Sequence, residues 1–294
     1  MKLLKTSVWA ALLAIGVVYA MIGYSNEKEP EQKPHEPAVA VAPSKAPTAV
    51  PGALPASGEA ATDGSVMPEP VPSPTVPAEN QTAVSKPVIY LDPGHQRKGN
   101  NELEPVAPGS KAMKPKVSGG TTGVSTGKPE YVLNLEVAVL LKQMLEEQGM
   151  EVLMTREEHD VDISNKQRAE LANEASARLA VRLHADGNES PKAEGFSVLY
   201  PHPSVIPDEA VQASSLKAAE LIHDALKEST GAKSRGIVPR QDLSGFNWST
   251  VPVVLVEMGF MTNPAEDVRM SDPDYQRKLA EGMAQGIVAY IQTS

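Results

Sequence analysis

Short apolar runs alternate with stretches of helical periodicity in the chain after residue 86. An apolar run bounded by Gly, Pro or charged residues is typical of a buried strand. This rule predicts strands at 88–91, 151–155, 179–183, 195–200 and 251–256. Apolar residues that recur every three or four positions predict helices at 131–148, 162–177, 209–229 and 273–292. The segments 96–129 and 235–249 show neither pattern, and we predict long loops there.

The alternation of strands and helices predicts an α/β fold. Several of the strands are apolar throughout, which is typical of a mostly parallel, twisted sheet with helices on both faces. Residues 87–294 have an ordinary globular composition, and we predict that they form a single domain. In such sheets ligands bind at the carboxyl ends of the strands, so polar residues there are the candidates for chemistry.

The segment 26–86 has no apolar periodicity and is crowded with proline and alanine. Its prolines recur every few residues, among them Pro43, Pro47, Pro51, Pro55, Pro68, Pro70, Pro72, Pro74 and Pro77. Such a segment cannot bury enough apolar surface to offset the entropy that it would lose on folding. We therefore predict a disordered linker that acts as an extended, semi-rigid spacer.

Residues 1–25 have the pattern of a targeting segment. Lys2 and Lys5 precede an uncharged and largely apolar run at 8–24. This pattern is typical of an export signal or of an uncleaved membrane anchor, and the length of the run lies between the two. We expect the segment to engage the membrane during export or as an anchor, and the folded domain to lie outside the cytoplasm.

Charge and cysteine content narrow the possible functions. The chain has 37 acidic and 27 basic residues and a formal net charge of −10. This balance argues against nucleic acid as a partner, because phosphate binding depends on clustered Lys and Arg. The absence of cysteine excludes disulfides, thiolate metal sites, a cysteine nucleophile and a lipid anchor on cysteine. No Gly-x-Gly-x-x-Gly opens a helix after a strand, so a dinucleotide site has no support.

Three ionisable residues lie at the carboxyl ends of different predicted strands. His95 follows the first strand by a short turn, while His184 and Glu257 directly follow the strands at 179–183 and 251–256. Each residue alone is weak evidence, but together they would converge on one edge of the sheet and could bind zinc. The other histidines lie in the linker, in loops or on a helix and have weaker claims as ligands: His35, His159, His202 and His223.

Four segments of the chain resemble the zinc-dependent N-acetylmuramoyl-L-alanine amidases of the amidase-3 family. They occur in the family's order, and the resemblance spans residues 87–293. The segments are Leu91-Asp92-Pro93-Gly94-His95, Glu130-Tyr131-Val132-Leu133-Asn134-Leu135, Arg182-Leu183-His184-Ala185-Asp186 and Val254-Leu255-Val256-Glu257-Met258-Gly259-Phe260-Met261-Thr262-Asn263. The last of them is the most specific.

The resemblance implies a role for each matching residue. His95, Glu130 and His184 would be zinc ligands, and Glu257 would be the general base. The residues alone favour a different role for Glu130, because a carboxylate at the start of a helix interacts favourably with the helix dipole. Glu136 lies within the same helix at a position where the family has no ligand.

The resemblance also implies a reaction. The chain would be a monomeric, zinc-dependent hydrolase of the bacterial cell wall that cleaves the amide between N-acetylmuramic acid and L-alanine in peptidoglycan. The residue types alone indicate only metal-assisted hydrolysis of an amide. The alternatives are a zinc peptidase that acts within the stem peptide and a non-catalytic regulator that binds the wall. The chain departs from the family pattern in its long insert at 96–129 and in Arg182, which replaces a small polar residue.

Overall fold

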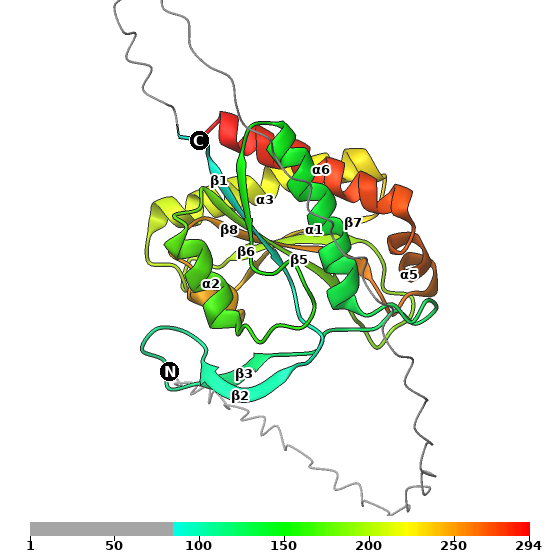
Figure 1. Ribbon diagram of the computed structural model, residues 1–294, viewed down its shortest axis with the longest axis horizontal. Coiled ribbons are helices and arrows are strands. Elements are labelled where there is room, and N and C mark those ends of the chain that lie inside the picture. Colours follow the sequence, from blue (N-terminus) through cyan, green and yellow to red (C-terminus); the bar gives the residue numbers. More distant parts are fainter. Residues whose placement is uncertain (1–84) are drawn as a thin grey trace, which may run out of the picture. The chain divides into compact units, whose positions relative to one another are not determined.

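The computed structural model describes residues 85–294, so the predictions for 1–25 and for nearly all of 26–86 lie outside the described residues. Six strands form the main sheet in the order β4-β1-β5-β8-β6-β7 (Figure 1). Their bounds are β1 Val88–Pro93, β4 Glu151–Met154, β5 Leu179–Asp186, β6 Phe196–Pro201, β7 Ser234–Arg240 and β8 Val253–Phe260. All neighbouring strands are parallel except β6 and β8, which are antiparallel. The predicted mostly parallel sheet is therefore confirmed.

Helices cover both faces of this sheet, as the sequence predicts. Helices α1 (Glu130–Glu147), α3 (Glu209–Thr230) and α6 (Pro273–Gln292) pack over one face. Helices α2 (Asn165–Glu174) and α4 (Ser244–Asn247) pack over the other, where a smaller apolar cluster lies. No helix of residues 85–294 is long and apolar enough to cross a membrane.

Helix ends follow local sequence signals. Ser164 and Gln167 form a capping box at the start of α2, and Gly231 ends α3 in the left-handed conformation. Asp272 caps α6, whose first residue is proline. Helix α1 differs, because its N-cap residue Pro129 offers no capping side chain. The carboxylate of Glu130, the first residue of α1, accepts hydrogen bonds from backbone N–H groups outside the helix.

Both predicted loops contain regular structure, so those two predictions are wrong in part. The segment 96–129 includes a hairpin of β2 (Asn100–Pro105) and β3 (Met113–Val117), drawn at the bottom of Figure 1. The segment 235–249 holds most of β7 and all of α4, and helix α5 (Pro264–Met270) follows β8. The hairpin strands are largely exposed and β7 is an edge strand, so neither carries an apolar run.

The hairpin is fixed to the domain by polar contacts. The Trp248 Nε1–H donates to the carbonyl of Pro105 at 2.9 Å, and the Asn165 amide donates to the carbonyl of Lys116 at 2.9 Å. The Lys166 ammonium lies 4.4 Å from the centroid of the Trp248 ring. These contacts hold β2 and β3 against the N-terminal end of α2 and against α4.

One face of the sheet changes from apolar to polar along its strands. In β5, Ala180 packs in the smaller apolar cluster, whereas Arg182 and His184 follow on the same side. In β8, Leu255 is followed on that side by Glu257. The polar positions all lie toward the carboxyl ends of the parallel strands, and this places the candidate site.

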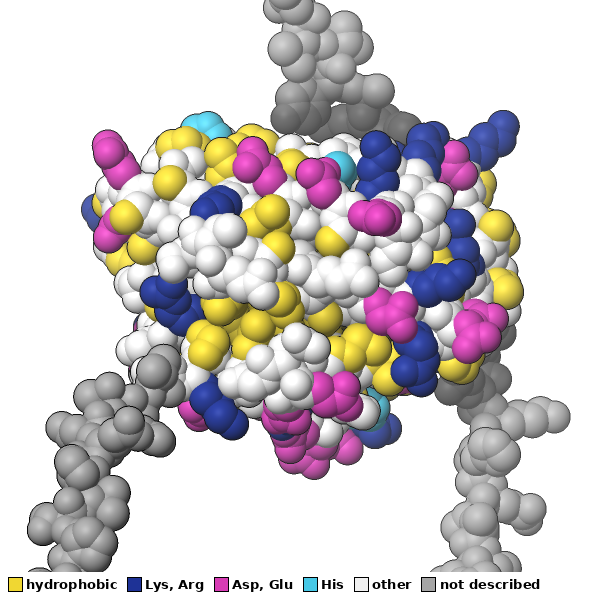
Figure 2. All heavy atoms as spheres, turned by 90° about the horizontal axis from the view of Figure 1, so that it is seen from above, with side chains coloured by type: hydrophobic (Ala, Val, Ile, Leu, Met, Phe, Trp, Pro, Cys, Tyr) yellow, Lys and Arg dark blue, Asp and Glu magenta, His cyan; other side chains and the backbone are white. Residues whose placement is uncertain are grey.

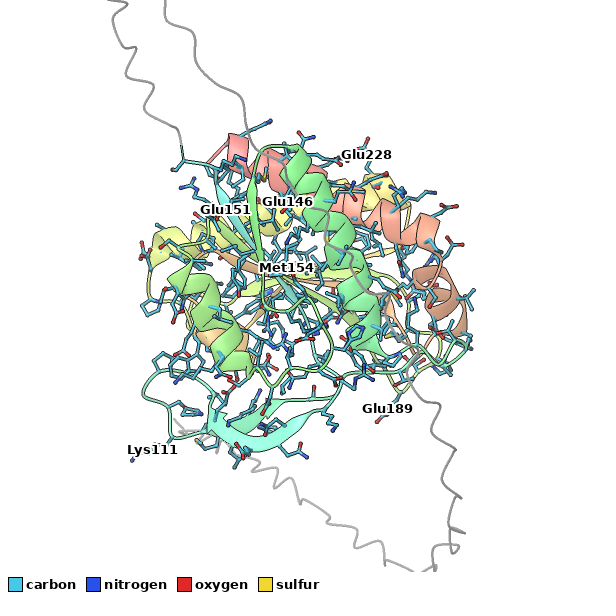
Figure 3. All side chains as sticks on the ribbon, in the orientation of Figure 1. Lys111, Glu146, Glu151, Met154, Glu189 and Glu228 are labelled. Atoms are coloured by element: carbon cyan, nitrogen blue, oxygen red, sulfur yellow. The ribbon has the colours of Figure 1, made fainter. Side chains whose placement is uncertain are left out.

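The surface of the described domain has mixed charge. On the face drawn in Figure 2, acidic and basic side chains lie among one another beside a band of hydrophobic ones. Lys111 in the β2–β3 hairpin and Glu189 in the loop after β5 point away from the body of the domain (Figure 3). Met154, at the end of β4, lies near the middle of the same view.

Candidate metal centre

Three side chains from separate segments meet at the carboxyl edge of the sheet. His95 Nε2 lies 3.1 Å from Glu130 Oε1, and His184 Nδ1 lies 3.1 Å from the same oxygen. The two ring nitrogens are 3.1 Å apart, and the imidazole planes stand at 82° to each other. Three possible ligand atoms therefore face one another in a small triangle. The structure brings together all three residues predicted to bind metal.

His184 and Glu257 lie within strands and not beyond their ends, so their predicted placement is wrong by a few residues. β5 continues to Asp186 and β8 to Phe260, and His184 pairs directly with Glu257 in register. Backbone pairing does not stop where side chains become polar, whereas an apolar run does. The register puts the two side chains on adjacent strands and on the same face.

The backbone of His95 is held in an unusual conformation. Its φ of 61° lies in the left-handed region, which non-glycine residues seldom adopt. The Nδ1–H donates to the carbonyl of Ser118 at 3.0 Å, so the Nε2 lone pair faces the triangle. A Cβ atom on Gly94 would lie 2.2 Å from the His184 ring. Only glycine allows this close approach.

Glu130 is the first residue of α1, but its carboxylate bonds outside the helix. It accepts the backbone N–H of Thr121 at 2.8 Å and that of Ala185 at 3.1 Å. Burial alone would raise the pKa of Glu130, but hydrogen bonds with His184 and His95 outweigh burial and hold the pKa well below its usual range. Glu130 therefore remains a charged carboxylate among the two histidines.

These residues could hold a metal ion. Zinc binds histidine and carboxylate at about 2.0–2.1 Å, so tetrahedral ligands lie about 3.3 Å apart. The three separations of 3.1 Å are close to this value. Burial lowers the pKa of His184 to about 4, even though Glu130 acts against the shift, so this ring is neutral and able to coordinate at pH 7. Three protein ligands leave a fourth position free.

The triangle lies in a pocket with a volume of about 370 Å³. Besides the predicted residues, the pocket is lined by Ser118, Gly119, Gly120, Thr121, Ala185, Asp186 and Gly187. The residues at 118–121 lie within the insert, directly after the β2–β3 hairpin. Sequence reasoning missed them because this polar stretch carries no motif.

Glu257 lines the same pocket without joining the triangle. Its Oε2 atom is buried and has no hydrogen-bond partner among residues 85–294. Burial, together with the charges of Glu130 and Asp186, raises the pKa of Glu257 well above its usual range. A cation bound nearby would lower this pKa again. Glu130 and Glu257 therefore line the same pocket but differ in pKa, which hydrogen bonds lower for Glu130 and burial raises for Glu257.

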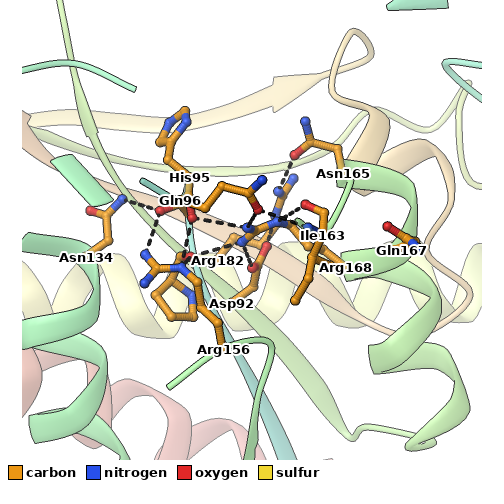
Figure 4. Close-up of polar contacts among 12 residues, drawn as sticks. Asp92, His95, Gln96, Asn134, Arg156, Ile163, Asn165, Gln167, Arg168 and Arg182 are labelled. Carbon is orange, nitrogen blue, oxygen red and sulfur yellow. Dashed lines mark hydrogen bonds and ion pairs between the residues drawn. The ribbon is translucent and has the colours of Figure 1, made fainter. Parts of the chain in front are cut away.

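A buried ionic network lies next to the triangle (Figure 4). Asp92 pairs with Arg168 at 2.7 Å and with Arg182 at 2.7 Å. Burial would raise the pKa of Asp92, but the two guanidinium groups lower it far below its ordinary range. Arg182, one of the two departures from the family pattern, is thus accounted for as an ion-pair partner. Arg156 lies beside this network, and burial and Arg168 lower its pKa to about 10.

The segment before α1 contains a short glycine–serine motif. Gly123-Val124-Ser125-Thr126-Gly127 has the Gly-x-Ser-x-Gly spacing of a serine-hydrolase nucleophile. That motif requires a serine on a turn from a strand to a helix, close to a histidine. Here the Ser125 N–H donates to Asp267 at 2.6 Å, and its hydroxyl lies 3.5 Å from the carbonyl of Pro264. No hydrogen bond joins Ser125 to a histidine among residues 85–294.

The remaining candidates among the described residues lie outside the triangle. Glu136 contacts Lys128 and Gln276. The other described histidines make unrelated contacts: His159 with Tyr131, His202 with Ser204, and His223 with Asp224 and Ser234.

Most of the described domain matches a known protein family. The model of the N-acetylmuramoyl-L-alanine amidase family matches residues 89–289. The chain belongs to this amidase family. The match begins in β1 and ends in α6, so it covers nearly all of the sheet and every residue of the triangle.

Individual amidases are similar to the chain over the same region. It is 28% identical to the N-acetylmuramoyl-L-alanine amidase Rv3717 of Mycobacterium tuberculosis, over 70% of this chain and 87% of that protein. It is 30% identical to the germination-specific N-acetylmuramoyl-L-alanine amidase of Bacillus subtilis, over 71% and 81%. The crystal structure of the amidase Ami1 from Mycobacterium smegmatis matches with a TM-score of 0.64 and 29% identity, over 71% of this chain and 98% of that one.

Proposed function

We propose that the chain is a zinc-dependent hydrolase that cleaves the amide between N-acetylmuramic acid and L-alanine in peptidoglycan. The observation that carries this proposal is the triangle of His95, Glu130 and His184 with Glu257 on the adjacent strand. The family supports the substrate, because the matched relatives are named for this reaction. The residues alone support hydrolysis of an amide with the help of a metal.

His95, Glu130 and His184 would hold the zinc ion. A bound zinc ion supplies a Lewis acid, which polarises a carbonyl group and makes a water molecule more acidic. Two histidines and one carboxylate are a ligand set found in hydrolytic zinc sites. The hydrogen bond from His95 Nδ1–H to Ser118 fixes the tautomer that this role requires.

Glu257 would accept and return a proton during hydrolysis. Its buried Oε2 has no competing partner among the described residues, so it is free to take a proton from an attacking water. The protonated carboxyl group would then donate to the nitrogen of the departing L-alanine. Because Glu130 makes fixed hydrogen bonds and Glu257 does not, the structure favours Glu130 as ligand and Glu257 as base.

No contact in the described residues favours the two alternative functions. A peptidase that acts within the stem peptide would need the same residues, so only the identity of the bond separates it from an amidase. A wall-binding regulator has no need of three ligand-type side chains with a buried carboxylate beside them. We infer that the protein is a monomer and that residues 1–25 deliver it to peptidoglycan outside the cytoplasm.

The metal assignment is tested by elemental analysis of the purified chain. We expect one zinc per chain, because one triangle occurs in residues 85–294. His184→Ala should lose most of the metal, whereas His202→Ala, which removes a half-buried histidine outside the triangle, should keep it. Full hydrolytic activity after exhaustive removal of metal by a chelator would contradict the assignment.

A further inference from the structure

The turn that carries His95 is bound by an arginine that has no acidic partner. Arg156 is 3% exposed, and no ion pair of Arg156 occurs in residues 85–294. Its guanidinium donates instead to the backbone carbonyls of five residues: Pro93, Gly94, His95, Tyr131 and Glu158. A buried cation without a counter-charge is costly, and a fold retains one where its hydrogen bonds have a specific use.

The bonds of Arg156 join two segments that each carry a ligand. Nε donates to the carbonyls of Pro93 at 3.0 Å and His95 at 2.8 Å. Nη2 donates to the carbonyl of Gly94 at 3.1 Å and to that of Tyr131, the residue after Glu130, at 2.8 Å. Figure 4 shows this guanidinium beside the His95 turn. One planar group therefore spans the turn and the first residues of α1.

Asn134 makes a second bridge between the same segments. Its amide donates to the carbonyl of Gly94 at 3.2 Å and lies 3.3 Å from Glu130 Oε1. The side chain is fully buried, and its own oxygen has no partner in the described domain. A buried amide that leaves one polar atom unpaired is better explained by the bridge than by packing.

The turn needs such support because its conformation is unfavourable. The left-handed backbone of His95 costs about 1 kcal/mol or more for a residue with a Cβ atom. Among the described residues only the Arg156 side chain donates to all three successive carbonyls of the turn; Arg168 also donates to those of Pro93 and His95, and Asn134 to that of Gly94. Without Arg156 the turn would keep these other donors but lose the one group that binds all three carbonyls together with Tyr131 of α1, so the His95 ring would shift relative to Glu130.

We propose that Arg156, together with Asn134, is a positioning residue that sets the separation of His95 and Glu130. This inference rests on the proposed zinc site and extends it to residues that touch neither metal nor substrate. It predicts that the guanidinium controls metal affinity and geometry independently of its contribution to stability.

The test is the zinc dissociation constant of full-length Arg156→Lys, measured by competition with a chelator. Lysine keeps the charge but cannot span the turn and α1 with one planar group. We expect the dissociation constant to rise about 10- to 100-fold, the usual effect of losing a group that orients a ligand. Arg182→Lys is the matched control, because Arg182 is buried beside Asp92 but bonds neither the turn nor α1. Its dissociation constant should change less than about threefold.

Two readouts separate positioning from a general loss of stability. The visible spectrum of the cobalt(II)-loaded chain reports ligand geometry, and it should change in Arg156→Lys but not in Arg182→Lys. In a His95→Ala background, Arg156→Lys should have little further effect on metal binding, because it acts through His95. Equal effects of the two lysine variants on affinity and spectrum would overturn the proposal.

Asn134→Ala keeps the proposal testable if Arg156→Lys does not fold. This variant removes only one bridge and should raise the zinc dissociation constant about 10-fold. An unchanged dissociation constant would overturn the proposal. If the wild-type chain itself binds no zinc, the proposed function fails first, and this outcome is distinct from wild-type binding with indifferent variants.

Discussion

At the scale of single residues, surroundings divide two nearby carboxylates into different roles. Glu130 receives backbone N–H groups from Thr121 and Ala185, which favour its charged form. Glu257 has a buried oxygen without a donor, and its pKa is raised by burial and then by Glu130. A carboxylate with several fixed donors suits a metal ligand, and one without donors suits a base.

Glu257→Gln separates these roles. Glutamine keeps the size of the side chain but cannot accept the proton, so turnover should fall about 100-fold or more while zinc content stays unchanged. Metal analysis and rates of peptidoglycan release check both parts. Glu136→Gln is the control, because Glu136 bonds Lys128 and Gln276 outside the triangle, and it should remain active. Loss of zinc from Glu257→Gln would make Glu257 a ligand.

Asp92→Asn tests the buried network beneath the site. Removing the charge leaves Arg168 and Arg182 without their shared partner, so the free energy of unfolding at pH 7 should fall by about 3–5 kcal/mol. Urea denaturation measures the change. Asp160→Asn, which breaks the exposed pair with Arg97, should cost less than about 1 kcal/mol.

The loss of unfolding free energy caused by Asp92→Asn should depend on pH. Because the pKa of Asp92 is lowered in the folded protein, its stabilisation is complete above the unfolded pKa of about 3.9. That stabilisation is lost as the pH falls below this value toward the folded pKa. The difference between wild type and Asp92→Asn should therefore shrink below about pH 4. A difference that stays constant with pH would contradict the assignment.

At the scale of elements, apolar patterns predict what is buried and miss what is not. The strand at 195–200 and the helix at 273–292 are predicted closely because their apolar residues form the core. The β2–β3 hairpin and β7 are missed because they are held mainly by backbone and polar bonds. His95, His184 and Glu257 can be recognised in the sequence because each follows an apolar run. Glu130 can be recognised as a ligand only through the family resemblance. Nothing in the sequence marks Arg156, because its acceptors are backbone carbonyls.

Helix α5 offers a test at this scale. Its buried Asp267 accepts the N–H of Ser125 at 2.6 Å and the N–H and hydroxyl of Thr126 at 2.8 and 2.7 Å. These bonds attach α5 to the segment that leads into α1. Asp267→Ala should lower the free energy of unfolding by about 2–4 kcal/mol, because it removes three hydrogen bonds that a fully buried carboxylate accepts. Asp274→Ala, also in the first turn of a helix but exposed, should change it by under about 1 kcal/mol in urea denaturation.

At the scale of the whole molecule, the core and the site both lie within residues 87–294. Both apolar clusters and the triangle fall in this range. We therefore expect residues 87–294 alone to fold and to bind zinc with the stoichiometry of the full chain. Circular dichroism and metal analysis of the shortened protein check this. An insoluble or unfolded product would mean that the preceding segment belongs to the domain.

The most direct test of the proposed reaction is the identity of the bond that is cut. Purified peptidoglycan is digested with the wild-type chain, and the products are identified by mass spectrometry, with Glu257→Gln as the control for contaminating hydrolases. We predict released stem peptides that begin with a free L-alanine amino group, and glycan strands that remain whole. New amino groups only within the peptide, with L-alanine still attached to muramic acid, would contradict an amidase and establish a peptidase.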